Sequence, residues 1–124
     1  MDKTFAFGVR IIKLYKYSQG RPTSSTLFKQ LLRSGTSIGA NVEDALAASS
    51  TADFIHKLNI AAKEARETSY WLRLLHDNDF LPSSLFNSIH QENGEIIKVL
   101  SSILLTTKAN AKAPPAAPPP THNS

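Results

Sequence analysis

The sequence predicts an all-α protein, an antiparallel up-down-up-down four-helix bundle followed by a disordered C-terminal tail rich in Pro and Ala. Two observations lead to this fold class. Four long segments carry apolar residues at three- and four-residue steps, which is the period of an amphipathic helix, and no stretch shows the sustained two-residue alternation of a strand. The connections between these segments are short, so successive helices are expected to run antiparallel.

The four expected helices cover residues 3–18, 25–48, 52–77 and 84–106. Pro22 and Pro82 lie in short polar connections, where proline disfavours helical backbone in the residue before it. A third break falls near residues 48–51. Thr51 is the expected N-cap of the third helix, because its hydroxyl can accept a hydrogen bond from the first helical turn.

The composition separates the chain into two parts. Five of the seven prolines lie after residue 107, in a stretch with too little apolar surface to offset the entropy lost on ordering. Hydrophobic residues make up 41% of the chain and charged residues 19%, which is enough for a packed core. We therefore expect one four-helix domain over residues 1–107 and a disordered tail over residues 108–124.

Several classes of protein are excluded by what the sequence lacks. Cysteine is absent, which excludes disulfides, thiol catalysis and cysteine-ligated metal centres. No stretch approaches the run of about 18 apolar residues that a membrane-spanning helix needs. The opening MDKTFAFGVR lacks the apolar region of a signal peptide. The chain is therefore expected to be cytoplasmic, without a membrane partner.

The histidines and carboxylates do not form a metal-binding pattern. Helical bundles hold di-iron sites through Glu-x-x-His pairs on two helices, and this chain has no such pair. Asp53 and His56 have that spacing once, near a helix start, while His76 lies near the other end of the same expected helix and His90 lies on the fourth. No serine with a paired base is apparent either. We expect no metal, no cofactor and no enzymatic activity.

The apolar surface is wider than one core requires. Apolar residues cover more than half the circumference of the first expected helix, whereas a helix that faces one core needs an arc of little over 100°. The third helix carries a second apolar seam, formed by Ile60, Trp71, Leu74 and Leu75. One interpretation is a thick core with some exposed apolar atoms. The other is that the second seams form the interface of a homo-oligomer.

Three residues stand out within the helical patterns. Gly35 and Gly39 lie inside the second helix, where each costs about 1 kcal/mol relative to alanine. We interpret them as a place where another helix approaches closely, in preference to a phosphate-binding loop. Glu92 falls on the apolar face of the fourth helix, so it is expected either to form an ion pair or to lie at the edge of the bundle, and the ion pair is favoured over a functional acid. Its expected partner is one of Arg33, Arg66 and Lys63.

Three stretches, residues 30–45, 53–75 and 93–104, carry motifs with fixed spacing. The pattern R-S-x-x-S-I-x-x-N is matched by Arg33, Ser34, Ser37, Ile38 and Asn41. The run K-E-A-R-E-T-S-Y-W-L at residues 63–72 includes Glu67. With the opening helix, these stretches resemble the bacterial four-helix bundle protein family, whose first members were named for reading frames in intervening sequences of 23S rRNA genes.

The accessory variability determinant of diversity-generating retroelements is a more distant relative of that family. The resemblance implies a ring-like homo-oligomer, with a pentamer as the expected number of copies. It also implies no established enzymatic activity, and a family named for its shape leaves the function to be argued from particular residues.

The net charge of +4 is distributed unevenly. It is +6 over residues 1–42, −4 over residues 43–107 and +2 over residues 108–124. On the first helix, one polar side carries four basic residues: Lys3, Arg10, Lys13 and Lys16. We expect this side to bind RNA or DNA largely without sequence preference.

Two other interpretations of the same residues stay open. The basic side of the first helix can be a solvated surface that binds nothing. Alternatively, the chain is a protein–protein scaffold or adaptor with no nucleic-acid role, whose second apolar seams or Ala/Pro-rich tail hold a protein partner.

Overall fold

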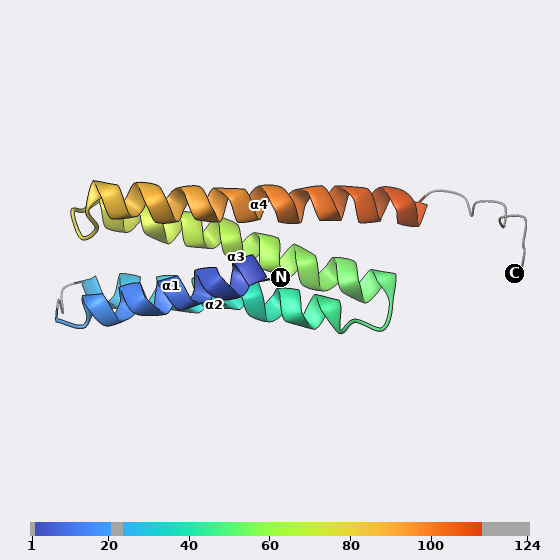
Figure 1. Cartoon of the computed structure of the whole chain (residues 1–124), viewed down its shortest axis with the longest axis horizontal. Helices are drawn as coiled ribbons and strands as arrows, with labels where there is room; N and C mark the ends of the chain where they lie inside the picture. The colour runs from blue at the N-terminus through green and yellow to red at the C-terminus, as the bar shows by residue number, and fades with distance from the viewer. Residues whose placement is uncertain (1, 21–23, 113–124) are drawn as a thin grey trace, which may run out of the picture.

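The computed structural model describes residues 2–20 and 24–112, and Figure 1 shows the helices that this part of the chain forms. They are α1 (Asp2–Ser18), α2 (Ser25–Leu46), α3 (Thr51–Asp77) and α4 (Ser83–Lys112). Consecutive helices run antiparallel, and the described residues contain no strand. The predicted all-α four-helix bundle is therefore confirmed.

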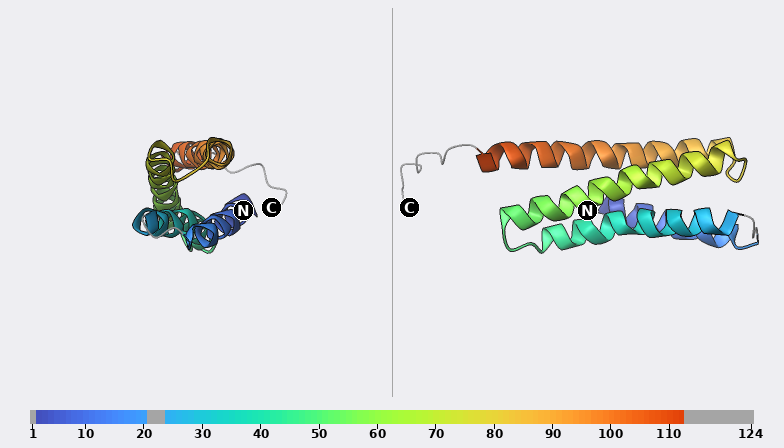
Figure 2. Two further views of the ribbon diagram at one scale, coloured as in Figure 1. Left: turned by 90° about the vertical axis from the view of Figure 1, so that its left-hand side faces the viewer. Right: turned by 180° about the vertical axis from the view of Figure 1, so that it is seen from behind.

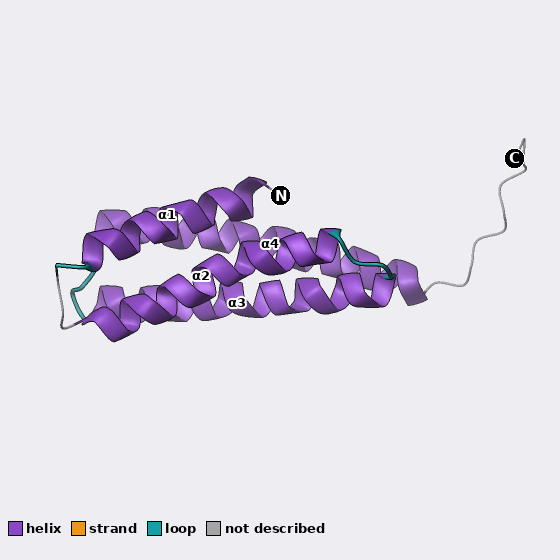
Figure 3. Cartoon of the chain, turned by 90° about the horizontal axis from the view of Figure 1, so that it is seen from below, coloured by secondary structure: helices purple, strands orange, loops and turns teal. Residues whose placement is uncertain are grey.

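The four helices form an open arc. Seen along the long axis, α3 lies between α2 and α4, and α1 lies beside α2 (Figure 2). Each helix packs against its neighbour in the sequence, whereas α1 and α4 meet over only a short stretch. Because α1 has 17 residues and α4 has 30, the N-terminus lies near the middle of the bundle's length (Figures 1 and 3).

One apolar face of each helix builds the core. The large apolar side chains with less than 2% exposure are Phe7, Ile11, Phe28, Leu31, Ile38, Val42, Leu58, Leu72, Leu75, Ile89 and Leu100. Burial of a side chain of this size contributes about 1.5–3 kcal/mol relative to leaving it in water. The core therefore provides most of the stability that holds the polar sites in place.

Two glycines of α2 mark a close approach of α1. A Cβ atom at Gly35 would lie 2.9 Å from Cγ1 of Ile11, and one at Gly39 would lie 3.3 Å from the carbonyl oxygen of Thr4. Both distances are shorter than an ordinary van der Waals contact between such atoms. The close-approach interpretation is confirmed, and both glycines lie inside a helix, so the phosphate-loop interpretation is wrong.

One polar side chain, Asn93 of α4, is completely buried among these apolar groups. Its Nδ2 donates a hydrogen bond to the carbonyl oxygen of Ala65, at 2.8 Å, while its Oδ1 has no partner among the described residues. The amide therefore ties α4 to α3 at the cost of one unsatisfied acceptor.

The start of α3 differs from the sequence prediction by one residue. Ser50, with extended φ and ψ of −146° and 159°, is the N-cap, and its side chain accepts the backbone N–H of Asp53 at 3.1 Å. The prediction of Thr51 as N-cap is wrong, because Thr51 already lies within the helix. The extended backbone typical of an N-cap falls on Ser50, and only there does the hydroxyl reach the third helical N–H.

Substitution of Ser50 by alanine is expected to lower the free energy of unfolding by about 1 kcal/mol, because the N–H of Asp53 loses its acceptor. Urea denaturation followed by circular dichroism measures the change. Thr51→Ala is the matched control and should leave the midpoint nearly unchanged. A larger effect of Thr51→Ala than of Ser50→Ala would contradict the assignment of the cap.

The last helix is longer than predicted. It continues to Lys112, past the expected helix end at residue 106 and through Lys108, where the tail was expected to begin. Lys and Ala dominate residues 108–112, and both favour helical backbone, which explains the extension. The expected disorder of the remaining tail concerns residues 113–124, which lie outside the described residues, as does Pro22.

Candidate nucleic-acid interface

The basic side of α1 consists of three exposed lysines and one half-buried arginine. Lys3, Lys13 and Lys16 are exposed, and within the described residues none of them forms an ion pair. Arg10 differs, because its Nη1 lies 2.7 Å from Oε1 of Glu92 and its Nη2 donates to the hydroxyl of Ser88 at 2.8 Å. The three lysines are therefore free to meet an anion, whereas Arg10 already shares its charge.

The pair of Arg10 and Glu92 joins α1 to α4 at the short stretch where these helices meet. An ion pair for Glu92 is confirmed, but its partner is Arg10, and the expected partners Arg33, Arg66 and Lys63 are wrong. The side chains are 35% and 32% exposed, so solvent screens much of their attraction. The sequence pattern places Glu92 on an inward face but does not say which helix lies opposite.

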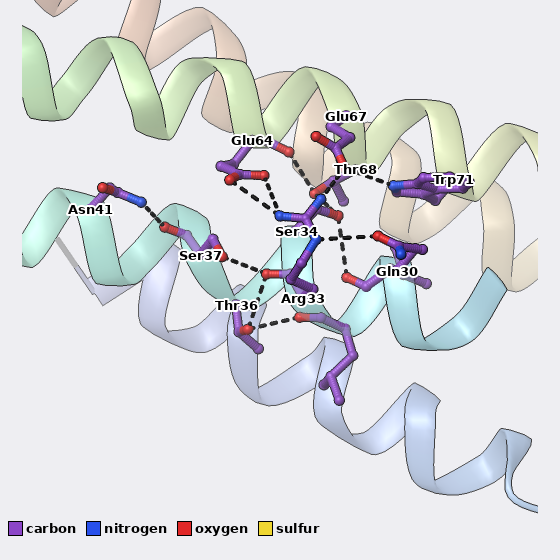
Figure 4. Close-up of polar contacts among 12 residues, drawn as sticks. Gln30, Arg33, Ser34, Thr36, Ser37, Asn41, Glu64, Glu67, Thr68 and Trp71 are labelled. Atoms are coloured by element: carbon purple, nitrogen blue, oxygen red, sulfur yellow. Dashed lines mark hydrogen bonds and ion pairs between the residues drawn. The ribbon is translucent and has the colours of Figure 1, made fainter. Parts of the chain in front are cut away.

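A second polar cluster lies between α2 and α3, around Arg33 (Figure 4). Nη1 of Arg33 lies 3.2 Å from Oε1 of Glu64, its Nη2 pairs with Glu67, and its Nε donates to Oε1 of Gln30 at 3.2 Å. The indole Nε1 of Trp71 donates to the same Glu67 carboxylate at 3.2 Å. Gln30 and Arg33 come from α2 and the other three residues from α3, so the cluster fastens these two helices together.

The charges of this cluster keep the guanidinium of Arg33 paired with carboxylates. Burial lowers the pKa of its guanidinium, but hydrogen bonds and the negative charges of Glu64 and Glu67 outweigh that effect, so the pKa is raised above its usual value. Two carboxylates surround one cation, and the arginine therefore has little charge left for a phosphate. The basic character of the N-terminal part thus rests on lysines of α1, with Lys29 exposed on α2.

The remaining motif residues have structural positions. Ile38 is fully buried, and the hydroxyls of Ser34 and Thr68 lie 3.0 Å apart inside the α2–α3 contact. Ser37 donates to the carbonyl oxygen of Arg33 at 2.6 Å, and Asn41 donates to that of Ser37 at 2.9 Å. Within the motif, Arg33 and Ser34 therefore join α2 to α3, whereas Ser37 and Asn41 form hydrogen bonds within α2.

The second apolar seam of α3 is only partly at the surface. Ile60, Trp71 and Leu74 are half-buried, and Trp71 packs partly against the core. Leu75 is fully buried within the single chain, so its assignment to an oligomer interface is wrong. The core face of α3 runs through Thr68, Leu72 and Leu75, so the spacing of three and four residues continues inward to Leu75.

A serine, a histidine and an aspartate meet at the α3–α4 connection, which the sequence pattern does not reveal. Nε2 of His76 lies 3.0 Å from the hydroxyl of Ser83, and its Nδ1 lies 3.2 Å from Oδ1 of Asp77. A hydrolase triad needs a shielded carboxylate that fixes the imidazole, whereas the Asp77 side chain is 77% exposed. His76 also stacks on Phe86, with ring centroids 4.2 Å apart. We therefore interpret this cluster as a set of structural contacts that stabilise the α3–α4 connection.

The part of the chain that the structure describes contains neither a cluster of metal ligands nor a membrane-spanning helix. Among residues 2–20 and 24–112, no three His, Asp or Glu side chains gather in a way that could hold a metal ion. None of the four described helices has an apolar stretch long enough to cross a membrane.

Comparison with known proteins places most of the bundle in one family. A family model described as "23S rRNA-intervening sequence protein" matches residues 1–102. The chain is also similar to a crystal structure from Bacteroides thetaiotaomicron, described as a protein with unknown function from the S23 ribosomal protein family. The two are 50% identical with a TM-score of 0.80, and the match covers 83% of this chain and 95% of the other. No curated protein matches the sequence.

Proposed function

The chain belongs to the 23S rRNA-intervening sequence protein family, and from this premise we propose that it is a non-enzymatic, homo-oligomeric protein that binds RNA or DNA through α1. We define its basic face as Lys3, Arg10, Lys13 and Lys16. The observation that carries the proposal is the contrast between the cations of the bundle. Arg33 is paired with two carboxylates, although its side chain is 46% exposed, while Lys3, Lys13 and Lys16 are exposed without an acidic partner in the described part of the chain.

In this proposal, the three lysines provide most of the affinity for nucleic acid. A lysine is a flexible point charge that meets a phosphate without reading a base, so binding should depend little on sequence. Arg10 contributes less, because a phosphate must compete with Glu92 for its guanidinium. Each contact is weak and sensitive to salt, so repetition of the basic face over several copies, with a pentamer as the expected ring, supports useful affinity.

Reversal of the charges at Lys3 and Lys13 to glutamate is expected to abolish binding in a mobility shift with single- and double-stranded RNA and DNA. Both side chains are exposed, so the fold should be unaffected. The matched control reverses Lys63 and Lys98, which are also exposed but lie on α3 and α4. The control has the same net charge and should keep most of the affinity. Equal losses in both variants would mean that net charge, and not this face, causes the binding.

A further inference from the structure

A cleft of about 310 Å³ lies between α1 and α4, beside the basic face. The residues that line it are Arg10, Lys13, Leu14, Tyr17, Leu85 and Ile89. Leu14 and Ile89 are buried and form its apolar floor, whereas Lys13 and Tyr17 are exposed at its rim. The volume is that of a small-ligand site, a class that begins at about 300 Å³.

The two ends of this cleft differ in chemistry. At one end, Arg10 reaches across to α4, where its Nη1 lies 2.7 Å from Oε1 of Glu92. Tyr17 lies seven residues further along α1, about 10 Å away. Because α1 and α4 run antiparallel, Leu85 lies at the same end of the cleft as Tyr17. One end is therefore apolar and aromatic and the other is charged, and Lys13 lies between them.

A nucleotide has the same division. Its base presents a flat face that stacks on aromatic rings, and its phosphate carries negative charge. In a duplex the bases are paired and stacked on one another, so a protein side chain reaches only the phosphates and the base edges in the grooves. An unpaired base can stack on an aromatic ring while its phosphate meets a lysine. A cleft with an aromatic wall beside exposed lysines is therefore suited to a single strand.

A second groove, of about 340 Å³ between α1 and α2, has a different lining. Phe5, Val9 and Ile12 line it from α1, and Glu43 is the one charged residue among the described residues that line it. The exposed carboxylate of Glu43 would repel a phosphate. Of the two grooves beside α1, the cleft towards α4 is therefore the one whose charges match a nucleic acid.

We infer that the cleft between α1 and α4 holds one unpaired nucleotide of a single-stranded nucleic acid, with its base against Tyr17 and Leu85 and its phosphate at Lys13. The inference rests on the proposed function and adds a preference for single strands over duplexes. The side chains of Leu14, Leu85 and Ile89 offer a base no hydrogen-bond partner, so the identity of the base should matter little. Tyr17 thereby joins the lysines of the basic face as a binding residue.

The first test compares two single strands of DNA that carry the same number of phosphates. One is a strand of about 12 deoxythymidines, and the other has the same backbone without bases. Fluorescence anisotropy of the labelled strands, with the full-length chain at about 50 mM salt, measures both dissociation constants. The thymidine strand is expected to bind at least about fivefold more tightly, which is the low end of the effect of stacking one base. Equal affinities for the two strands would overturn the inference.

The second test removes the aromatic wall. Tyr17→Ala should lose at least about fivefold in affinity for the thymidine strand and leave the affinity for the abasic strand nearly unchanged. Tyr17→Phe keeps the ring and should retain the affinity for both strands. Tyr70→Ala is the matched control, because Tyr70 is 47% exposed, as Tyr17 is, but lies on α3. Circular dichroism checks that the variants fold.

A Tyr17→Ala chain that keeps its preference for the thymidine strand would overturn the inference. So would a Tyr70→Ala chain that loses this preference to the same extent as Tyr17→Ala. The comparison of the two strands needs no variant, so it decides the inference even where a substitution disturbs the fold.

The outcomes also distinguish the inference from the proposed function. A chain that binds the thymidine and abasic strands equally, with an affinity that falls as the salt concentration rises, would leave the proposed function standing and overturn the inference. A chain that binds neither strand and no duplex would contradict the proposed function and the inference together.

Discussion

Replacement of Gly35 by leucine is expected to separate α1 from α2 and to lower the free energy of unfolding by about 3 kcal/mol or more. A Cβ atom at this position lies 2.9 Å from Cγ1 and 3.0 Å from Cγ2 of Ile11. Ile11 is fully buried and β-branched, so it has nearly one allowed rotamer in a helix and cannot move aside. The two helices must move apart instead, and the burial of Phe7, Ile11 and Leu14 is reduced.

Urea denaturation of the purified chain measures this loss. Gly94→Leu is the control, because a Cβ atom at Gly94 meets nothing within 4 Å, and this variant should not destabilise the fold. Gly35→Ala adds the Cβ atom alone and should therefore lose less stability than Gly35→Leu. Equal midpoints for Gly35→Leu and Gly94→Leu would show that α1 does not approach α2 in this way.

The second large effect is expected for Asn93→Asp, which should cost about 3–5 kcal/mol at pH 7. The amide is completely buried and already has one unsatisfied oxygen. A carboxylate in place of the amide cannot donate a hydrogen bond to the carbonyl oxygen of Ala65. Among the described residues, no cation is paired with the side chain at position 93. The folded chain must therefore bury an unpaired charge or keep the new carboxyl protonated.

The pH dependence identifies the cause of this loss. Burial raises the pKa of the new carboxyl in the folded state above its unfolded value of about 4. The folded chain then binds more protons than the unfolded chain, so stability falls as the pH rises through this window, by up to about 1.4 kcal/mol per unit. Asn93→Leu removes the unsatisfied oxygen and should change stability by no more than about 1 kcal/mol. The measurement compares the denaturation midpoints of Asn93→Asp and Asn93→Leu between pH 4 and 7. A difference between the two midpoints that stays constant over this range would contradict this account.

The fold was largely predictable because it depends on helical periodicity. The spacing of apolar residues places every helix end within two residues except the end of α4, which lies six residues further on, and Pro82 marks the last connection. The sequence predictions are wrong where the burial of a residue depends on the exact rotation of its helix about the helix axis, or where one residue decides the position of an N-cap. Leu75 turns inward because the core face passes through Thr68, whose buried hydroxyl contacts the hydroxyl of Ser34 and the carbonyl oxygen of Glu64. Asn93 is buried although its neighbour Glu92 is the residue that the pattern singles out.

The site was less predictable, because partners across helices depend on the packing. The sequence marks Arg33 as a motif residue, but its pairing with Glu64 and Glu67 depends on how α2 packs on α3. Similarly, Arg10 belongs to the basic face in the sequence, and only the α1–α4 contact reveals that Glu92 shares its charge. Exposure of Lys3, Lys13 and Lys16 did follow from the helical period, since they lie away from the buried face of α1.

The central claim, that exposed lysines of α1 bind nucleic acid, is tested most directly by the salt dependence of binding to a short DNA duplex. Each neutralised phosphate contributes about −0.9 to the slope of log K against log salt concentration. Three lysines from even one copy therefore predict a slope steeper than about −2.5, and the Lys3→Glu/Lys13→Glu chain should show no measurable binding. No binding of the unmodified chain at about 50 mM salt, or an affinity that does not change with salt, would contradict the claim.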